Sequence, residues 1–221
     1  YSSTTFESIE KTNYSGARLG FGFQYDINDR ITIGGTAQLP TSLNGNLKRS
    51  VNKSLSGIDI SVEDESSDYV SDFKLPLELG FGMSIKPIEE ITFSADYKKN
   101  FWTDTDQSEN IGNYQDQDIY AFGLEYLQDP SSYKYGQRIS YRLGYNYDNG
   151  YLAIGDSKVE GYNFTAGVGI PTSRGTHSMI NLSYSYGSKG LLQNVLVKEN
   201  YHLITLNLSL EDLWFVKRKI N

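Results

Sequence analysis

A strict alternation of apolar and other side chains over residues 73–85 constrains the fold of this chain more than any other feature. The apolar members, at every second position, are Phe73, Leu75, Leu77, Leu79, Phe81, Met83 and Ile85. A β-strand places successive side chains on opposite faces, whereas the apolar residues of an amphipathic helix recur about every 3.6 residues. The segment therefore predicts a strand with one apolar face and one polar face.

Eight further segments alternate in the same way, which predicts nine strands. They are residues 17–27, 31–39, 91–97, 120–126, 139–147, 162–170, 180–186 and 202–210. Several are longer than the strands of globular proteins, which average about 5–6 residues, and match the roughly 9–11 residues that cross a bilayer at a tilt. We therefore expect an all-β fold, an antiparallel transmembrane β-barrel, formed by residues 1–221 as a single domain.

The apolar content of the chain consists largely of aromatic rings. There are 18 Tyr and 10 Phe, yet the hydrophobic fraction is only 38%. No stretch approaches the roughly 20 apolar residues of a helical membrane span, whereas barrel strands are apolar at only every second position. Tyrosines also gather at one set of predicted strand ends, as in an interfacial girdle: Tyr145, Tyr147, Tyr162, Tyr184, Tyr186 and Tyr201. A soluble β-protein with a tyrosine-rich core is the alternative.

The predicted links alternate between short and long. Residues 28–30 and 86–90 are short, whereas 40–72 and 102–118 are long. Outer-membrane barrels have short periplasmic turns and longer external loops, so 40–72 is expected to be a long extracellular loop that can extend as a hairpin through Ile58, Ile60 and Val62. An odd number of strands further suggests the C-terminal part of a larger barrel, with N-terminal sequence missing. A tenth strand over 57–62 would instead give a small closed barrel.

Charge and residue types argue against several functions. Lys and Arg total 20 and Asp and Glu total 27, so the net charge of −7 opposes binding to nucleic acid. The chain has no Cys, and its two histidines, His177 and His202, lie in no cluster. We therefore expect no metal, no cofactor and no enzymatic activity, since zinc and Ser-His-Asp sites both depend on clustered histidine.

Ionisable residues on the predicted lumen face are the remaining candidates for a site. They are Arg18, Lys74, Glu78, Asp96, Lys98, Glu125, Arg138 and Arg142. Pairing across strands is the preferred interpretation, for example between Glu78 and Lys98. The candidates for binding a hydrophobic carboxylate are Arg142, Lys98, Arg18 and Glu78, because such a ligand requires a cation in an otherwise apolar pocket.

The sequences of residues 19–34, 73–76, 79–82 and 91–97, and the tail 181–219, resemble the FadL-type long-chain fatty acid transporters. The resemblance implies a fourteen-stranded barrel in the outer membrane, surrounded by lipid, with an N-terminal hatch and a lateral opening. It implies passive uptake of a hydrophobic small molecule, such as a long-chain fatty acid. Secretion-associated members of the family imply an alternative, a structural or docking subunit bound to partners in an outer-membrane protein complex. The hatch has no counterpart here, and no ligand-contacting residue carries over.

Overall fold

The structure, a computed structural model, describes residues 4–55, 58–109, 112–155, 157–172, 178–190, 192 and 197–210. For 4–6, 52, 55, 58–69, 108 and 109 it describes the backbone alone. The chain divides into two compact units, each treated by itself below. Unit 1 comprises Tyr1–Gly20 and Gln38–Leu77, and unit 2 comprises Phe21–Ala37 and Glu78–Asn221.

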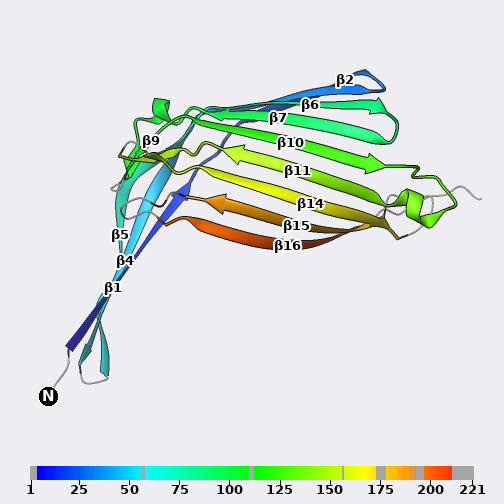
Figure 1. Ribbon diagram of the computed structural model, residues 1–221. Helices are drawn as coiled ribbons and strands as arrows, with labels where there is room; N and C mark the ends of the chain where they lie inside the picture. Colours follow the sequence, from blue (N-terminus) through cyan, green and yellow to red (C-terminus); the bar gives the residue numbers. More distant parts are fainter. Residues whose placement is uncertain are drawn as a thin grey trace, which may run out of the picture. The chain divides into compact units, whose positions relative to one another are not determined.

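Unit 2 is built on a nine-stranded sheet with the order β16-β15-β14-β11-β10-β7-β6-β3-β2 (Figure 1). Neighbouring strands from β6 to β16 pair antiparallel. The bounds are β2 (Gly20–Asn28), β3 (Ile31–Gln38), β6 (Glu78–Ile88), β7 (Ile91–Asn100), β10 (Gln117–Leu127), β11 (Ser140–Asp148), β14 (Gly161–Pro171), β15 (Met179–Lys189) and β16 (Glu199–Ser209). Each corresponds to one of the nine predicted strands, so the prediction of an all-β antiparallel fold is confirmed.

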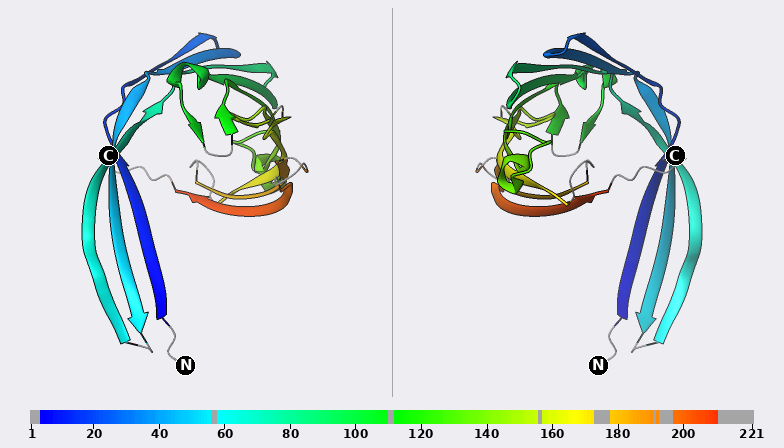
Figure 2. Two further views of the ribbon diagram at one scale, coloured as in Figure 1. Left: turned by 90° about the vertical axis from the view of Figure 1, so that its left-hand side faces the viewer. Right: turned by 90° about the vertical axis from the view of Figure 1, so that its right-hand side faces the viewer.

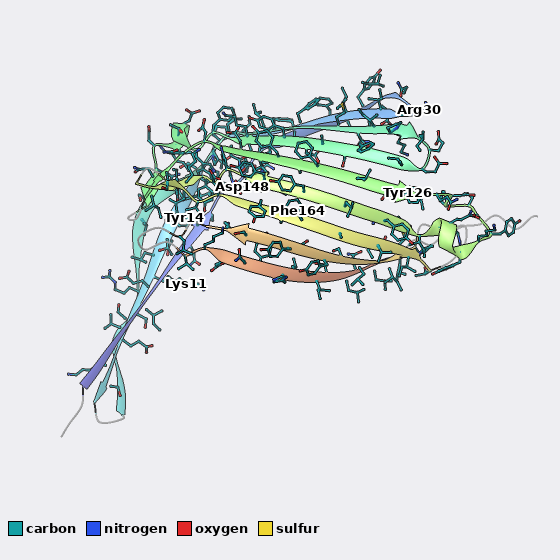
Figure 3. All side chains as sticks on the ribbon, viewed as in Figure 1. Lys11, Tyr14, Arg30, Tyr126, Asp148 and Phe164 are labelled. Carbon is teal, nitrogen blue, oxygen red and sulfur yellow. The ribbon has the colours of Figure 1, made fainter. Side chains whose placement is uncertain are left out.

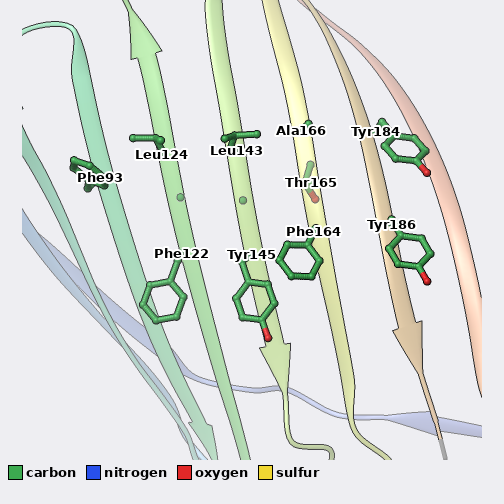
Figure 4. A pocket seen from close by; sticks show the side chains of 12 residues that line it. Phe93, Phe122, Leu124, Leu143, Tyr145, Phe164, Thr165, Ala166, Tyr184 and Tyr186 are labelled. Atoms are coloured by element: carbon green, nitrogen blue, oxygen red, sulfur yellow. The ribbon is translucent and has the colours of Figure 1, made fainter.

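The two faces of this sheet differ in side-chain size as well as in polarity. One cross-strand row consists of Phe122, Tyr145, Phe164 and Tyr186, and the next row, on the other face, of Gly123, Gly144, Thr165 and Ser185. The sheet is curved, and the aromatic row lies on its convex face (Figures 2 and 4). Curvature spreads side chains on the convex side and crowds them on the concave side, which suits rings outside and glycine, serine and threonine inside.

Apolar side chains on one face of the nine-stranded sheet are exposed, among them Phe164, which is labelled in Figure 3. Among the described residues, Ala153 is the one hydrophobic residue classed as buried, whereas Phe122, Phe164 and Leu143 are each more than half exposed. A soluble sandwich would enclose such residues between two layers. The exposed apolar face instead resembles the outer wall of a transmembrane barrel.

One predicted strand boundary is wrong. The alternation over 73–85 predicted a continuous strand, but β5 (Ile58–Leu75) ends before Pro76, and β6 begins at Glu78. Proline has no N–H to donate to a ladder, and Pro76 is fully buried between the two strands. Residues 73–77 therefore belong to unit 1 and residues 78–85 to unit 2.

Unit 1 is a three-stranded antiparallel sheet with the order β1-β4-β5, formed by β1 (Thr4–Ser15), β4 (Thr41–Leu55) and β5. β4 and β5 are the hairpin that the sequence allowed within 40–72. The segment 58–62 is a strand of this sheet and not a tenth strand of the nine-stranded sheet. β1 pairs with β4 along its whole length, from Thr4 opposite Leu55 to Ser15 opposite Asn44.

A small third sheet, within unit 2, joins two of the links. Its order is β13-β12-β9-β8, with β8 (Ser108–Glu109), β9 (Gly112–Tyr114), β12 (Leu152–Ile154) and β13 (Ser157–Lys158). Two 3-10 helices, η1 (Thr103–Thr105) and η2 (Tyr135–Arg138), complete the described elements. Within the described part of the chain, no helix is long and apolar enough to span a membrane.

Candidate functional site

Arg142 is held in a polar network on the concave face of the nine-stranded sheet. Its Nε donates to Glu125 Oε2 at 2.5 Å and its Nη1 to Asn181 Oδ1 at 2.9 Å. Glu125 is the direct cross-strand partner on β10, whereas Asn181 lies on β15, beyond the intervening β14. A Cβ on Gly169 of β14 would lie 3.0 Å from Asn181 Oδ1, so this glycine gives Arg142 the space to reach across. The guanidinium thereby links β10, β11 and β15.

Lys98 and Glu78 form a salt bridge, as the sequence predicted. Lys98 is directly opposite Gly80, so Glu78 is its diagonal neighbour on β6. Diagonal partners in antiparallel sheets remain within reach of long side chains. The pair ties β6 to β7 on the same face that carries Arg142.

Arg18 lies in unit 1, where its guanidinium binds backbone carbonyl groups. Nε donates to Leu39 O at 3.0 Å, and Nη2 donates to Pro76 O. The Leu39 N–H in turn donates to Leu19 O at 2.9 Å. Arg18 thus joins three chain segments at the points where they leave unit 1.

The concave face offers paired charges and small polar groups. Thr165 and Ser185 share a hydrogen bond of 2.7 Å, and a Cβ on Gly82 or Gly123 would lie 2.4 Å from Asp96 Oδ1 or Ser94 Oγ, respectively. No group of three or more His, Cys, Asp and Glu side chains that could hold a metal is present among the described residues. This arrangement can fix strand register and tolerate water, but its described lining is not the apolar wall that a hydrocarbon ligand prefers.

An apolar hollow of unit 2 lies on the opposite, convex face. It is a groove of about 530 Å³ that runs over β7, β10, β11, β14 and β15 (Figure 4). Its main lining residues are Phe93, Phe122, Leu124, Leu143, Tyr145, Phe164, Ala166, Tyr184 and Tyr186. Tyr145 and Phe164 pack with their ring centroids 4.7 Å apart. A groove so placed lies on the face opposite the paired charges of Arg142 and Glu125.

An aromatic cluster that the sequence did not predict holds two links together. Trp102, Tyr114 and Tyr151 pack against one another with ring centroids 5.1, 5.2 and 5.5 Å apart. Asp118 and Asn149 lock the same links, since the Asp118 N–H donates to Asn149 Oδ1 at 2.7 Å and the Asn149 N–H donates to Asp118 O at 3.1 Å. In the sequence, only the position of Trp102 directly after a predicted strand pointed to this cluster. Contacts between two links leave no pattern within either link.

One of the two histidines, His202, contacts neighbouring tyrosines. His202 Nδ1 lies 2.6 Å from Tyr184 Oη, next to the ring of Tyr186. His177 lies outside the described residues. The sequence prediction that neither belongs to a catalytic cluster remains a prediction.

Comparisons with known proteins agree with this geometry. A family model described as BamG matches residues 2–221. Among solved structures, the chain is similar to the CymD monoaromatic hydrocarbon channel (17% identity, TM-score 0.56), the Ralstonia pickettii toluene transporter TbuX (18%, 0.54) and the Pseudomonas putida toluene transporter TodX (20%, 0.55). Each match covers 85% of this chain and 49%, 46% and 47% of the other chain, respectively, so this chain spans about half the length of these structures. No curated protein matches. The fold is that of a FadL-type β-barrel.

Proposed function

The chain belongs to the BamG family, and from that premise we propose that it forms part of a FadL-type barrel in the outer membrane and serves as a docking subunit of a protein complex there. The barrel wall anchors the protein in lipid, and the three-stranded sheet of unit 1 offers the docking surface. The single observation that carries this proposal is that unit 1 is a long sheet with polar residues on both faces.

The length of unit 1 supports a position outside the lipid. β4 has 15 residues and β5 has 18. At about 3.3 Å per residue they extend for roughly 50–60 Å, about twice the 25 Å apolar band of an outer-membrane barrel. A large part of such a hairpin therefore requires surroundings other than hydrocarbon.

Side chains of β1 lead to the same conclusion. Glu7 and Lys11 occupy one face of the strand and Glu10 the other, and residues 7–15 are exposed. Glu10 accepts a hydrogen bond from Arg49 Nε of β4 at 2.9 Å. Neither face of β1 matches a lipid surface, whereas strand edges with water on both sides are sites where partner chains add.

The concave face of the nine-stranded sheet supports docking over transport. Arg142 and Lys98, two of the candidate ligand-binding residues, pair with Glu125 and Glu78. A fatty-acid carboxylate would have to displace these partners, and the described residues around them supply hydroxyl groups and glycine. The role of Arg142, Lys98, Arg18 and Glu78 as a ligand site belongs to the second candidate function.

That second candidate is passive transport of a hydrophobic compound, such as a long-chain fatty acid, across the outer membrane. It is favoured by the likeness of the fold to a hydrocarbon channel and two toluene transporters. In that case the ion pairs of the concave face would open to admit the ligand. Uptake of radiolabelled oleate or toluene that is unchanged on deletion of the gene would reject it.

Shortening the unit 1 hairpin tests the docking function. We would join Leu47 to Asp68, which are opposite each other, through Asn-Gly, and purify the tagged full-length protein from its own outer membrane in mild detergent. The expected result is loss of a stoichiometric protein partner by at least about tenfold, while the barrel still shows the gel shift of a folded outer-membrane protein. A control that carries Arg142→Gln and Lys98→Gln should keep the partner. Retention of the partner by the shortened protein would contradict docking through unit 1.

A further inference from the structure

A second hollow of unit 2 lies at the ends of β11, β14 and β15. It encloses about 380 Å³ and is lined by polar groups, among them Lys158, Lys198, Ser157 and Ser188. Glu160 is the one carboxylate in the lining, so the two lysines leave a local charge of +1 in a chain whose net charge is −7. Ser188 is only 3% exposed, although it is a polar residue. A small cationic and hydroxyl-lined hollow is suited to an anion with several acceptor oxygens.

The groups in the polar hollow retain donors for such an anion. Lys158 Nζ donates to Asp116 O at 2.9 Å, which uses one of the three N–H donors of an ammonium group. Glu160 Oε2 accepts from the Tyr147 hydroxyl at 3.1 Å, so this carboxylate already has a partner on the wall of the hollow. Phosphate oxygens could therefore be met by both lysines at a site of net positive charge.

The polar hollow lies next to the apolar groove along three strands. On β11, Tyr147 lines the hollow and Tyr145 the groove; on β14 the corresponding residues are Tyr162 and Phe164, and on β15 they are Ser188 and Tyr186. Two residues along a strand span about 7 Å. The rings of Tyr162 and Phe164 pack with centroids 6.0 Å apart, so aromatic surface is continuous between the two sites.

We infer that these adjoining hollows together bind one phosphorylated lipid. Its phosphate lies between Lys158 and Lys198, and its acyl chain lies in the groove over Phe164. The occupant must be amphiphilic, because a polar anion would leave the groove empty and a neutral hydrocarbon would leave the lysines without an anion. Lys158 binds Asp116 in the long link 102–118, which is expected outside the cell, so the phosphate is expected at the level of lipid head groups. This inference does not depend on the docking function.

Native mass spectrometry of the purified full-length protein in detergent micelles tests the inference. The probes are palmitoyl lysophosphatidic acid, monopalmitoylglycerol, which has the same chain without the phosphate, and inorganic phosphate. The natural protein should bind one lysophosphatidic acid at least about tenfold more tightly than monopalmitoylglycerol, and inorganic phosphate should compete only weakly.

Two sets of variants separate the head-group site from the groove. Lys198→Gln, alone and with Lys158→Gln, should remove most of the preference for the phosphorylated probe. Phe164→Ala should lower the affinity for both lipids about threefold. Phe81→Ala is the matched control for the groove, since Phe81 is 52% exposed and Phe164 54%, and Phe81 lines a separate apolar hollow with Phe21 and Leu79. Lys86→Gln is the control for charge near the end of β6. Both controls should bind as the natural protein does.

Three results would overturn the inference. Equal affinity of the natural protein for the two lipids would mean unspecific contact with surrounding lipid. Full displacement by inorganic phosphate, together with no effect of Phe164→Ala, would mean a free-anion site without a lipid. Unchanged phosphate preference in Lys198→Gln and in the double variant, with the folded-barrel gel shift retained, would exclude the lysines as the head-group site.

Discussion

The two main sheets of this protein share a backbone plan and differ in what their faces contact. Both are antiparallel, and both present many exposed side chains. In the nine-stranded sheet the exposed residues of one face are aromatic and aliphatic, whereas β1 of the three-stranded sheet places charged residues on both faces. The comparison shows that exposure concerns an apolar surface in the first sheet and a charged surface in the second, so under the proposed function the first contacts lipid and the second contacts water or a protein partner.

The largest difference between the sheets is expected when a charge replaces an exposed aliphatic residue. Leu143, in the middle of β11, is 59% exposed, and Ile9, in β1, is 51% exposed. Leu143→Arg should lower the free energy of unfolding in lipid vesicles by about 2–4 kcal/mol, because it places a cation in the apolar band. Ile9→Arg should change it by less than about 0.5 kcal/mol. Urea titration in vesicles measures both, and equal effects would mean that the two sheets share one solvent.

A smaller effect is expected at the base of unit 1. Arg18→Gln removes charge-assisted hydrogen bonds to the carbonyl groups of Leu39 and Pro76, which should destabilise the three-stranded sheet by about 2 kcal/mol. Amide exchange in β4 should then accelerate about 30-fold, measured by hydrogen–deuterium exchange with mass spectrometry. β11 of the nine-stranded sheet is the internal reference and should not change. Acceleration in both sheets would show that they open as one unit.

The smallest contrast is expected between two ion pairs of similar exposure. The side chain of Arg142 is 44% exposed and that of Arg49 is 43%. Arg142→Gln disrupts contacts to two strands other than its own and should lower the free energy of unfolding by about 1 kcal/mol, whereas Arg49→Gln breaks a surface pair with Glu10 worth at most about 0.5 kcal/mol. Urea titrations of the two variants at low and high salt would check the order, and a larger loss for Arg49→Gln would reverse the comparison.

The sequence predicted the nine-stranded sheet well because each strand carries its own signal. In 91–97 and 120–126 the period of two is complete within the segment, and a half-apolar strand needs no distant information to be recognised. The Glu78–Lys98 pair was also predictable, since a short link fixes the register of the two strands that it joins. At Pro76 the same alternation gave a wrong prediction of one continuous strand. The side chains keep alternating there, but proline has no N–H to continue the hydrogen bonds of the sheet.

The rest of the fold depends on contacts between distant segments. Nothing within 4–15 indicates that it pairs with 41–55, because β1 has polar residues on both faces and no period that assigns it a partner. Trp102, Tyr114 and Tyr151 likewise meet only when two links are joined by a small sheet. Arg18 was predicted to face the lumen only from its place in the alternation of residues 17–27. The carbonyl groups that it binds belong to residues 21 and 58 positions away along the chain.

The sequence by itself determined that most of this chain forms an antiparallel sheet with one apolar face, because alternating side chains mark the two faces along each of its nine strands. Only the tertiary structure decided that the hairpin within 40–72 joins β1 in a separate sheet, that Arg142 reaches across β14, and that a lysine-lined hollow adjoins the aromatic groove. Those features are made by residues from different strands, and their distances depend on register and curvature, which no single segment encodes.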